Sequence, residues 1–253
     1  MDRKSRTLST TKLSLEIIEL LAELEGAGVT RIATELDKPP STIHGHLSTL
    51  HEAEFVVRDG EEYRIGLKFL KLGKMIENSE EHFRRADKYT AKVAEELDAR
   101  SIFAVEEHGW CVYISRNAGD LSVWKHEMTG KRTYLHATAA GKAILANLPE
   151  KKIDEIVDRR GLPRMTESTI TDRAELDAEL QRVREQEVAF NREESVEGVK
   201  AVSAPVLDSD RQVFGALSAN GPAKQMIGEQ FETEIPKRLR GIANEFELDL
   251  QLS

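Results

Sequence analysis

Two short stretches near the start of the chain carry apolar residues at helical spacing. Ile32, Ala33 and Leu36 mark the first stretch, which is expected to begin at Thr30, whose hydroxyl can cap free backbone N–H groups. It should end by Lys38, because the two prolines that follow cannot continue a helix. The pattern therefore predicts a short helix that a tight turn ends.

A second helix should follow, with Pro40 at its entrance and a buried stripe formed by Ile43, Leu47 and Leu50. Its opposite face carries small polar side chains. These are Ser41, Thr42, His44, Gly45, Ser48 and Thr49. Small hydroxyl-bearing side chains suit a helix that lies close to base edges in the DNA major groove. We therefore expect this face to contact bases.

The pattern then changes to short β-prone runs on either side of Asp59-Gly60, a dipeptide that favours a hairpin turn. Such a wing usually offers basic residues to phosphates, and Arg58 and Arg64 are the candidates. Helix, turn, helix and hairpin in this order predict a winged helix-turn-helix that binds duplex DNA; the alternative is a domain of this pattern that contacts only protein. The expected DNA-binding residues are Thr30, Arg31, Ser41, Thr42, His44, Thr49, Arg58 and Arg64.

Amphipathic helices are expected on both sides of this motif. Residues 13–24 carry leucine and isoleucine at helical spacing, and should pack under the motif and help to pair two copies. Residues 67–76 predict a linker helix, which is either a lever that passes a signal to the DNA-binding part or a plain spacer. The expected organisation is a DNA-binding domain over residues 1–66, a linker helix over 67–79 and an effector-binding domain over 80–253.

Helical and strand-like patterns are mixed beyond residue 80. Strands are expected over residues 102–105, 112–114, 188–190, 199–206 and 213–217, and helices over 136–148, 153–157, 174–186 and 231–246. Adjacent strands joined by short turns predict a mainly antiparallel sheet in an α+β domain. The fold class expected for the whole chain is therefore α+β in two domains.

Composition limits the compartments and partners that fit. The chain has 253 residues, a net charge of −9, one cysteine and no apolar run that suits a leader or a membrane span, which predicts a cytoplasmic protein without a membrane partner. Cys111 lies in an apolar run and is expected in a buried strand. Residues 1–75 hold 11 Lys and Arg against 12 Asp and Glu, so the basic surface usual for DNA binding is thin. The acidic balance would suit a cytoplasm of high ionic strength.

The second domain carries no pattern typical of a catalytic or cofactor site. A phosphate-binding glycine loop, a nucleophile elbow and a paired-cysteine motif are all missing from its sequence, and its histidines lack the close spacing of metal ligands. We therefore expect no enzyme activity, no metal and no cofactor. A concave pocket for a small-molecule effector is the better expectation for a domain of this size beside a DNA-binding motif.

Both domains resemble the IclR family of transcription regulators. The resemblance rests on ELLAELEGAGVTRIATELDKPPSTIHGHLSTL in the first domain, and on HATAAGKAILA and VAFNREESVEGVKAVSAPVLDSDRQVFGALSANGPA in the second. It covers nearly the whole chain and implies an N-terminal winged helix-turn-helix, a linker helix and a C-terminal effector domain of GAF or profilin-like fold. It also implies homodimers or homotetramers on near-palindromic operators, acting as repressors or activators, often of catabolic operons.

The resemblance also implies an effector site. Family members use the start of the helix in HATAAGKA, here Ala139 and Ala140, where free N–H groups favour an anionic oxygen. Opposite this helix, members that bind small oxo-acids tend to have an aspartate, a cysteine and two serines. Here these positions hold Asn191, Ala201, Ser218 and Asn220. Amide groups donate and accept, which favours a neutral hydroxylated ligand, such as a sugar or sugar-acid derivative, over a two-carbon oxo-acid; the alternatives are that the asparagines cap turns or that no ligand binds.

The recognition helix departs from the family too. Members commonly have P-K-S-T-x-H-R where this chain has Pro39 to Gly45, so two cations are missing. Effector binding is expected to change the spacing of two recognition helices through the linker. Two alternatives remain: an architectural DNA binder without an effector, and a metabolite-binding protein or enzyme that kept a DNA-binding module.

Overall fold

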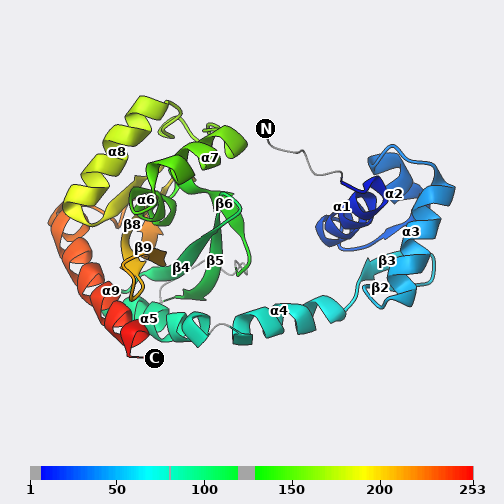
Figure 1. The fold of residues 1–253 in the computed structure, drawn as a ribbon, viewed down its shortest axis with the longest axis horizontal. Coiled ribbons are helices and arrows are strands. Elements are labelled where there is room, and N and C mark those ends of the chain that lie inside the picture. The colour runs from blue at the N-terminus through cyan, green and yellow to red at the C-terminus, as the bar shows by residue number, and fades with distance from the viewer. Residues whose placement is uncertain (1–6, 80, 119–128, 253) are drawn as a thin grey trace. The chain divides into compact units, whose positions relative to one another are not determined.

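A computed structural model describes residues 7–79, 81–118 and 129–252. The chain divides into two compact units, residues 1–79 and 80–253, and each is described by itself. Within the described ranges, no helix is long and apolar enough to span a membrane. The predicted α+β fold is confirmed in both units (Figure 1).

The first unit is a helix-turn-helix with a small antiparallel sheet. Its elements are α1 (Ser9–Glu23), β1 (Ala27–Gly28), α2 (Val29–Glu35), α3 (Pro40–Glu52), β2 (Val56–Asp59), β3 (Glu62–Ile65) and α4 (Lys68–Ser79). The core gathers one face of each of α1, α2 and α3, and the predicted stripe of Ile43, Leu47 and Leu50 on α3 lies in it. Burial of this stripe leaves the opposite face of α3 exposed.

Three details of this unit differ from expectation. Helix α2 begins at Val29 with Gly28 as its N-cap and has no side-chain cap, so the predicted capping by Thr30 is wrong. Strand β1 was not predicted, because its two residues are too few to show a period; it pairs with β3. The hairpin turns at Gly60 and its successor, since Asp59 still pairs with Glu62 in the ladder.

The second unit is a six-stranded antiparallel sheet with helices on both faces. Its strands are β4 (Arg100–Glu107), β5 (Trp110–Asn117), β6 (Arg132–Tyr134), β7 (Ala189–Arg192), β8 (Val199–Leu207) and β9 (Val213–Pro222), in the order β6-β5-β4-β9-β8-β7. Its helical elements are α5 (Glu81–Leu97), η1 (Leu135–Ala137), α6 (Ala139–Ala146), α7 (Glu150–Arg160), α8 (Arg173–Gln186), η2 (Gln230–Glu234) and α9 (Ile235–Gln251).

Alternation along the strands divides the residues of this sheet between two cores. Phe103 on β4 packs with α5 and α9 on one face, where Tyr89 and Phe246 stack with ring centroids 4.4 Å apart. Its neighbour Ile102 packs with α6, α7 and α8 on the other face. Figure 1 shows α5 and α9 along one side of the sheet and α6 on the other.

The segment predicted as one helix over residues 136–148 is two elements. A 3₁₀ turn over Leu135–Ala137 comes first, and α6 starts only after Thr138, whose extended backbone interrupts the helix. Gly141 lets the two elements come together, because a Cβ at this position would lie 2.1 Å from the carbonyl oxygen of Leu135. The start of α6 is therefore held tightly against the turn before it.

Candidate functional site

The exposed face of α3 has the small polar surface expected of a recognition helix. Ser41, Thr42, His44 and Thr49 are all exposed, opposite the buried stripe. The Thr49 hydroxyl donates to the carbonyl oxygen of Gly45 at 3.0 Å, which leaves its oxygen free to accept from a DNA group. Gly45 adds no bulk between these side chains, and an added Cβ there would meet no atom within 4 Å. The helix backbone can thus come close to a partner surface.

The two arginines of the wing lie on opposite faces of the hairpin. Arg64 is paired with Val57 in the β-ladder, and Arg58 is paired with buried Tyr63 in the next pair. Side chains of successive pairs point to opposite faces of a hairpin. Arg58 also donates from Nε to the carbonyl oxygen of Gly60 at 2.9 Å. The structure therefore does not bring these two cations onto one surface.

Thr30 and Arg31 lie at the start of α2 and are exposed, as are all eight residues predicted to contact DNA.

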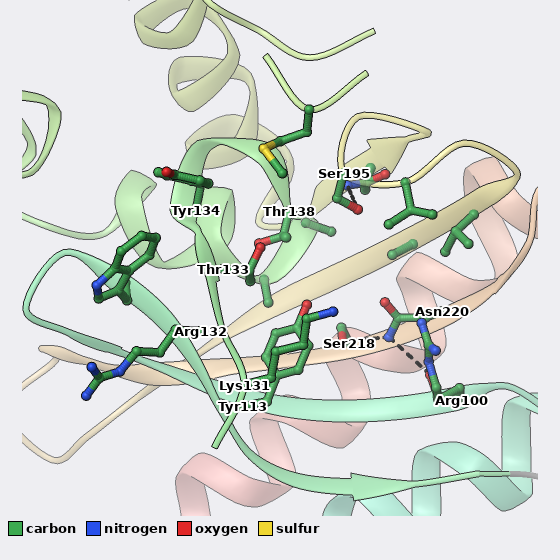
Figure 2. A pocket seen from close by; sticks show the side chains of 18 residues that line it. Arg100, Tyr113, Lys131, Arg132, Thr133, Tyr134, Thr138, Ser195, Ser218 and Asn220 are labelled. Atoms are coloured by element: carbon green, nitrogen blue, oxygen red, sulfur yellow. Dashed lines mark hydrogen bonds between the residues drawn. The ribbon is translucent and has the colours of Figure 1, made fainter. Parts of the chain in front are cut away.

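A cavity of about 520 Å³ lies between the sheet and the start of α6. This volume falls in the range of small-molecule sites. All six residues expected at the effector site line this cavity (Figure 2). They are Ala139, Ala140, Asn191, Ala201, Ser218 and Asn220. Segments far apart in the sequence thus meet around one cavity.

The floor of the cavity is one row of residues across four strands. Arg100 on β4 is opposite Asn220 on β9, which is opposite Ala201 on β8, which is opposite Asn191 on β7. Directly opposite residues point to the same face of a sheet, and this face is the one that α6 covers. The row therefore places three polar side chains on the floor, with Ala201 between the two asparagines and Arg100 at one end.

The first turn of α6 forms another wall. Thr138 caps the helix, and its hydroxyl oxygen accepts from the backbone N–H of Gly141 at 3.0 Å. The backbone N–H groups of Ala139 and Ala140 belong to the turn whose donors lack partners within the helix. This wall offers a partial positive charge to an anionic group in the cavity.

Asn191 is held on both sides of its amide. Its nitrogen donates to the carbonyl oxygen of Ala137 at 2.7 Å and to the Ser195 hydroxyl at 3.2 Å, and its oxygen accepts from the N–H of Glu194 at 3.1 Å. The side chain is buried and ties the turn before α6 to the loop after β7. It therefore shapes the wall of the cavity more than it offers a free group.

Asn220 and Ser218 are linked on the floor. The Asn220 amide nitrogen donates to the Ser218 hydroxyl at 2.9 Å and to the carbonyl oxygen of Arg100 at 3.1 Å (Figure 2). The Ser218 hydroxyl donates in turn to the carbonyl oxygen of Ile102. These bonds fix the orientation of the amide, so that its oxygen is the group available to a ligand donor.

Sequence reasoning missed the cationic residues of this cavity. Arg100, Lys131 and Arg132 line it, together with the aromatic side chains of Trp110 and Tyr113. Among the described residues that line it, none is Asp or Glu. Burial lowers the pKa of Arg100 below its ordinary value, but an arginine remains charged at neutral pH. The lining therefore favours an acidic ligand over a neutral one.

A buried lysine on α6 holds in place a loop that lines the cavity. Lys142 on α6 is 1% exposed, and its ammonium group lies 2.7 Å from Glu194 and 3.0 Å from Glu179. Glu194 belongs to the loop that also brings Ser195 and Val196 to the cavity. The ion pair thus fixes this loop against α6.

The other reactive groups of the unit are inert or remote. Cys111 lies in β5, as expected, and its complete burial raises the pKa of its thiol to about 12. In the parts of the chain that the structure describes, no group of three His, Cys, Asp or Glu side chains could hold a metal ion.

Comparison with known proteins identifies both units. The IclR helix-turn-helix domain matches residues 14–60, and the C-terminal domain of bacterial IclR transcriptional regulators matches residues 78–247. A relative in Halobacterium salinarum, named "Probable HTH-type transcriptional regulator ArcR", is 28% identical, and the match covers 97% of this chain and 95% of the relative.

Solved structures agree with this match over the whole length. IclR of Thermotoga maritima is 25% identical with a TM-score of 0.77, covering 96% of this chain and 99% of its own. An IclR homologue of Microbacterium hydrocarbonoxydans, complexed with 4-hydroxybenzoate, shares the fold with a TM-score of 0.78 at 20% identity. The match covers 97% of this chain and 100% of the homologue. The chain belongs to the IclR family of effector-controlled, DNA-binding transcription regulators.

Proposed function

We propose that this regulator binds a near-palindromic operator as a dimer, or as a pair of dimers, and that a small organic acid in the cavity controls this binding. Sugar acids combine hydroxyl groups, which can donate to the available amide oxygen of Asn220, with a carboxylate that suits the cations lining the cavity. A catabolic operon for such acids is the corresponding target. The observation that carries the proposal is the cavity itself, with Arg100 and the start of α6 on its walls.

The surface of α4 supports a dimer. Leu70, Met75 and Ile76 are 61%, 57% and 63% exposed, and Leu67 just before the helix is 81% exposed. Apolar side chains gathered on one linker helix are typical of a surface that a second copy covers. A groove of about 470 Å³ between α1 and α3, which Phe69 of α4 also lines, extends this surface. Two recognition helices paired in this way suit a near-palindromic site.

An acid as the effector is supported by charge and by a relative. The first turn of α6 favours an anionic oxygen, and Lys131 and Arg132 attract anions toward the cavity. The homologue of Microbacterium hydrocarbonoxydans is complexed with 4-hydroxybenzoate, which carries one carboxylate. An acid complements the positive charge of the cations that line the cavity, and a neutral sugar does not.

Strand β4 offers a route from the cavity to the linker. Arg100 points from this strand to the cavity, whereas Phe103 points to the opposite face and packs in the core that α5 closes. Helix α5 begins at Glu81, and α4 ends at Ser79. A ligand that displaces β4 would therefore displace α5 and, through it, the helix that connects to the DNA-binding part.

Selection of DNA from a genomic pool tests this proposal. The purified full chain is incubated with sheared genomic DNA over a series of salt concentrations, with and without gluconate or 4-hydroxybenzoate, and the retained DNA is sequenced. We expect a few near-palindromes to be enriched and an acid to change their retention. Uniform retention of all DNA would favour an architectural binder, and retention indifferent to every acid would remove the cavity from control.

Sedimentation of the same protein tests the dimer. A monomer at the concentration that retains DNA would contradict the pairing through α4, whereas a dimer that Met75→Glu separates would support it.

A further inference from the structure

We propose that a polar cluster between α5 and β5 holds the effector-binding unit in its acid-free state, and that Asn117 changes hydrogen-bond partners when an acid binds. The cluster consists of Asp87 and Thr90 on α5 and of Ser115 and Asn117 on β5. The inference rests on the proposed function, because it assumes that an acid in the cavity controls DNA binding. It assigns positioning roles to described side chains that lie outside the cavity lining.

Hydrogen bonds in this cluster fix α5 to β5. The Thr90 and Ser115 hydroxyl oxygens lie 2.8 Å apart, and the Ser115 hydroxyl also donates to the Asp87 carboxylate. The Asn117 amide nitrogen donates to the Thr90 hydroxyl oxygen at 2.8 Å and to the Asp87 carbonyl oxygen at 3.3 Å. Thr90 is fully buried. Because hydrogen bonds need a defined distance and direction, which apolar packing does not, the cluster sets the position of α5 along the strand.

A β-bulge lets β5 act on both faces of the sheet. In the ladder between β4 and β5, Tyr113 pairs with Ala104 and Ser115 pairs with Phe103. These partners are consecutive on β4, so Ile114 is an extra residue on β5. Residues two apart in a strand normally share a face, but here Tyr113 lines the cavity (Figure 2) while Ser115 bonds to α5. A ligand that displaces Tyr113 therefore acts on the cluster through the same strand.

Ser101 offers the Asn117 amide a second partner. It is fully buried on β4, and no group in the described part of the chain forms a hydrogen bond with its hydroxyl. A buried hydroxyl without a partner costs free energy that a new hydrogen bond would recover. Ser101 is directly opposite Asn117 in the ladder, and Cβ atoms in such pairs are about 5 Å apart on one face. The amide can therefore turn from Thr90 to Ser101 without a change of strand register.

The two partners of Asn117 define two states. In the structure its amide binds α5, through Thr90 and Asp87. In the second state the amide binds Ser101, and α5 loses both of these bonds to β5. An acid that displaces Tyr113 favours the second state. Asp87 and Thr90 lie in the first three turns of α5, the part that follows α4 in the chain, so their release frees the helix next to the linker.

The first test is operator affinity without acid, measured by fluorescence anisotropy on the full chain. Thr90→Val keeps the branched shape and removes the oxygen that accepts from Asn117, so the amide should move to Ser101. We expect the acid-free dissociation constant to change at least about fivefold. The matched control is Ser203→Ala, which removes another fully buried hydroxyl, bonded to the carbonyl oxygen of Leu217. It should leave the constant within about twofold.

Ser101→Ala tests the second state and keeps the test decisive if Thr90→Val fails to fold. It removes a hydroxyl without a partner, so it should be at least as stable as wild type in urea. In calorimetry with gluconate and 4-hydroxybenzoate, Ser101→Ala should weaken acid binding by about three- to tenfold, whereas Thr90→Val should tighten it. The double variant should return toward the wild-type affinity. A purely structural role would not move acid affinity in opposite directions, since neither residue lines the cavity.

The contrary outcomes separate this inference from the proposed function. Acid-free operator binding by Thr90→Val within about twofold of wild type would overturn the role of the cluster. Acid affinities that do not move in opposite directions in Thr90→Val and Ser101→Ala would overturn the exchange of partners. If neither acid binds wild type, the proposed function fails, and the acid-free comparison still decides whether the cluster sets the DNA-binding state.

Discussion

Replacement of Lys142 by methionine should destabilise the effector-binding unit strongly. Lys142 is 1% exposed and donates to both oxygens of Glu194, at 2.8 and 2.7 Å, and to one oxygen of Glu179 at 3.0 Å. Methionine fills a similar volume but leaves the Glu194 carboxylate, which is 7% exposed, without its cation. Glu179 retains Arg182 at 2.7 Å near the surface. The main effect is therefore one uncompensated buried charge.

Breaking a buried ion pair on one side costs about 3–5 kcal/mol. The partner variant Glu194→Gln, combined with Lys142→Met, removes the stranded charge and should recover at least about half of that loss. The matched control is Lys152→Met on α7, since Lys152 lies 3.8 Å from Glu106 and is 42% exposed at its side chain. A pair whose lysine lies at the surface in this way contributes about 0–1 kcal/mol.

Urea denaturation followed by tryptophan fluorescence measures these free energies. Both tryptophans of the chain, Trp110 and Trp124, lie after residue 79, so the signal reports the effector-binding unit alone. A loss below about 1 kcal/mol for Lys142→Met would refute the reasoning, because the charge of Glu194 would then be solvated in the folded state. A double variant less stable than the single one would refute it too.

Further substitutions test the recognition helix, the wing and a buried histidine. Gly45→Ala should stabilise the first unit by up to about 1 kcal/mol in thermal denaturation, because alanine favours a helix more than glycine does and its Cβ would meet no atom within 4 Å. The same variant should weaken operator binding. Unchanged binding would argue against close approach of this backbone to DNA. In competition assays, Thr42→Ala should reduce discrimination between operator and random DNA, whereas Arg64→Ala should weaken binding to both alike. Burial lowers the pKa of His136 below its ordinary value of 6.5, so as the pH falls the imidazole is protonated in the unfolded chain before it is protonated in the folded one. The free energy of unfolding should therefore fall as the pH drops below about 6.5. His136→Gln should flatten that decline in urea titrations at several pH values.

Local patterns predicted much of the fold. The apolar stripe of α3, together with Pro39 before it and Pro40 at its first position, located this helix, because side-chain spacing and proline geometry act within a few residues. The short strands β1 and β6 escaped prediction, since two or three residues show no period and become strands only by pairing with β3 and β5. The break at Thr138 depends on the close approach that Gly141 permits.

The candidate site shows the same limit. Its six expected residues came from the family resemblance, which carries information about three-dimensional neighbours that spacing alone lacks. Arg100 was missed because its place in the cavity depends on register with Asn220, which lies 120 positions later. Lys142 would be expected on a helix surface, and its burial is explained by two distant partners, Glu179 and Glu194, which lie 37 and 52 positions later.

Control of DNA binding by an acid is tested most directly by the affinity of the full chain for a selected operator, measured by fluorescence anisotropy with and without a saturating acid. We expect the acid to change the dissociation constant by about 5- to 150-fold, which is the usual range of coupling between two sites. An unchanged constant, with the acid shown by calorimetry to be bound, would contradict control of DNA binding through the cavity.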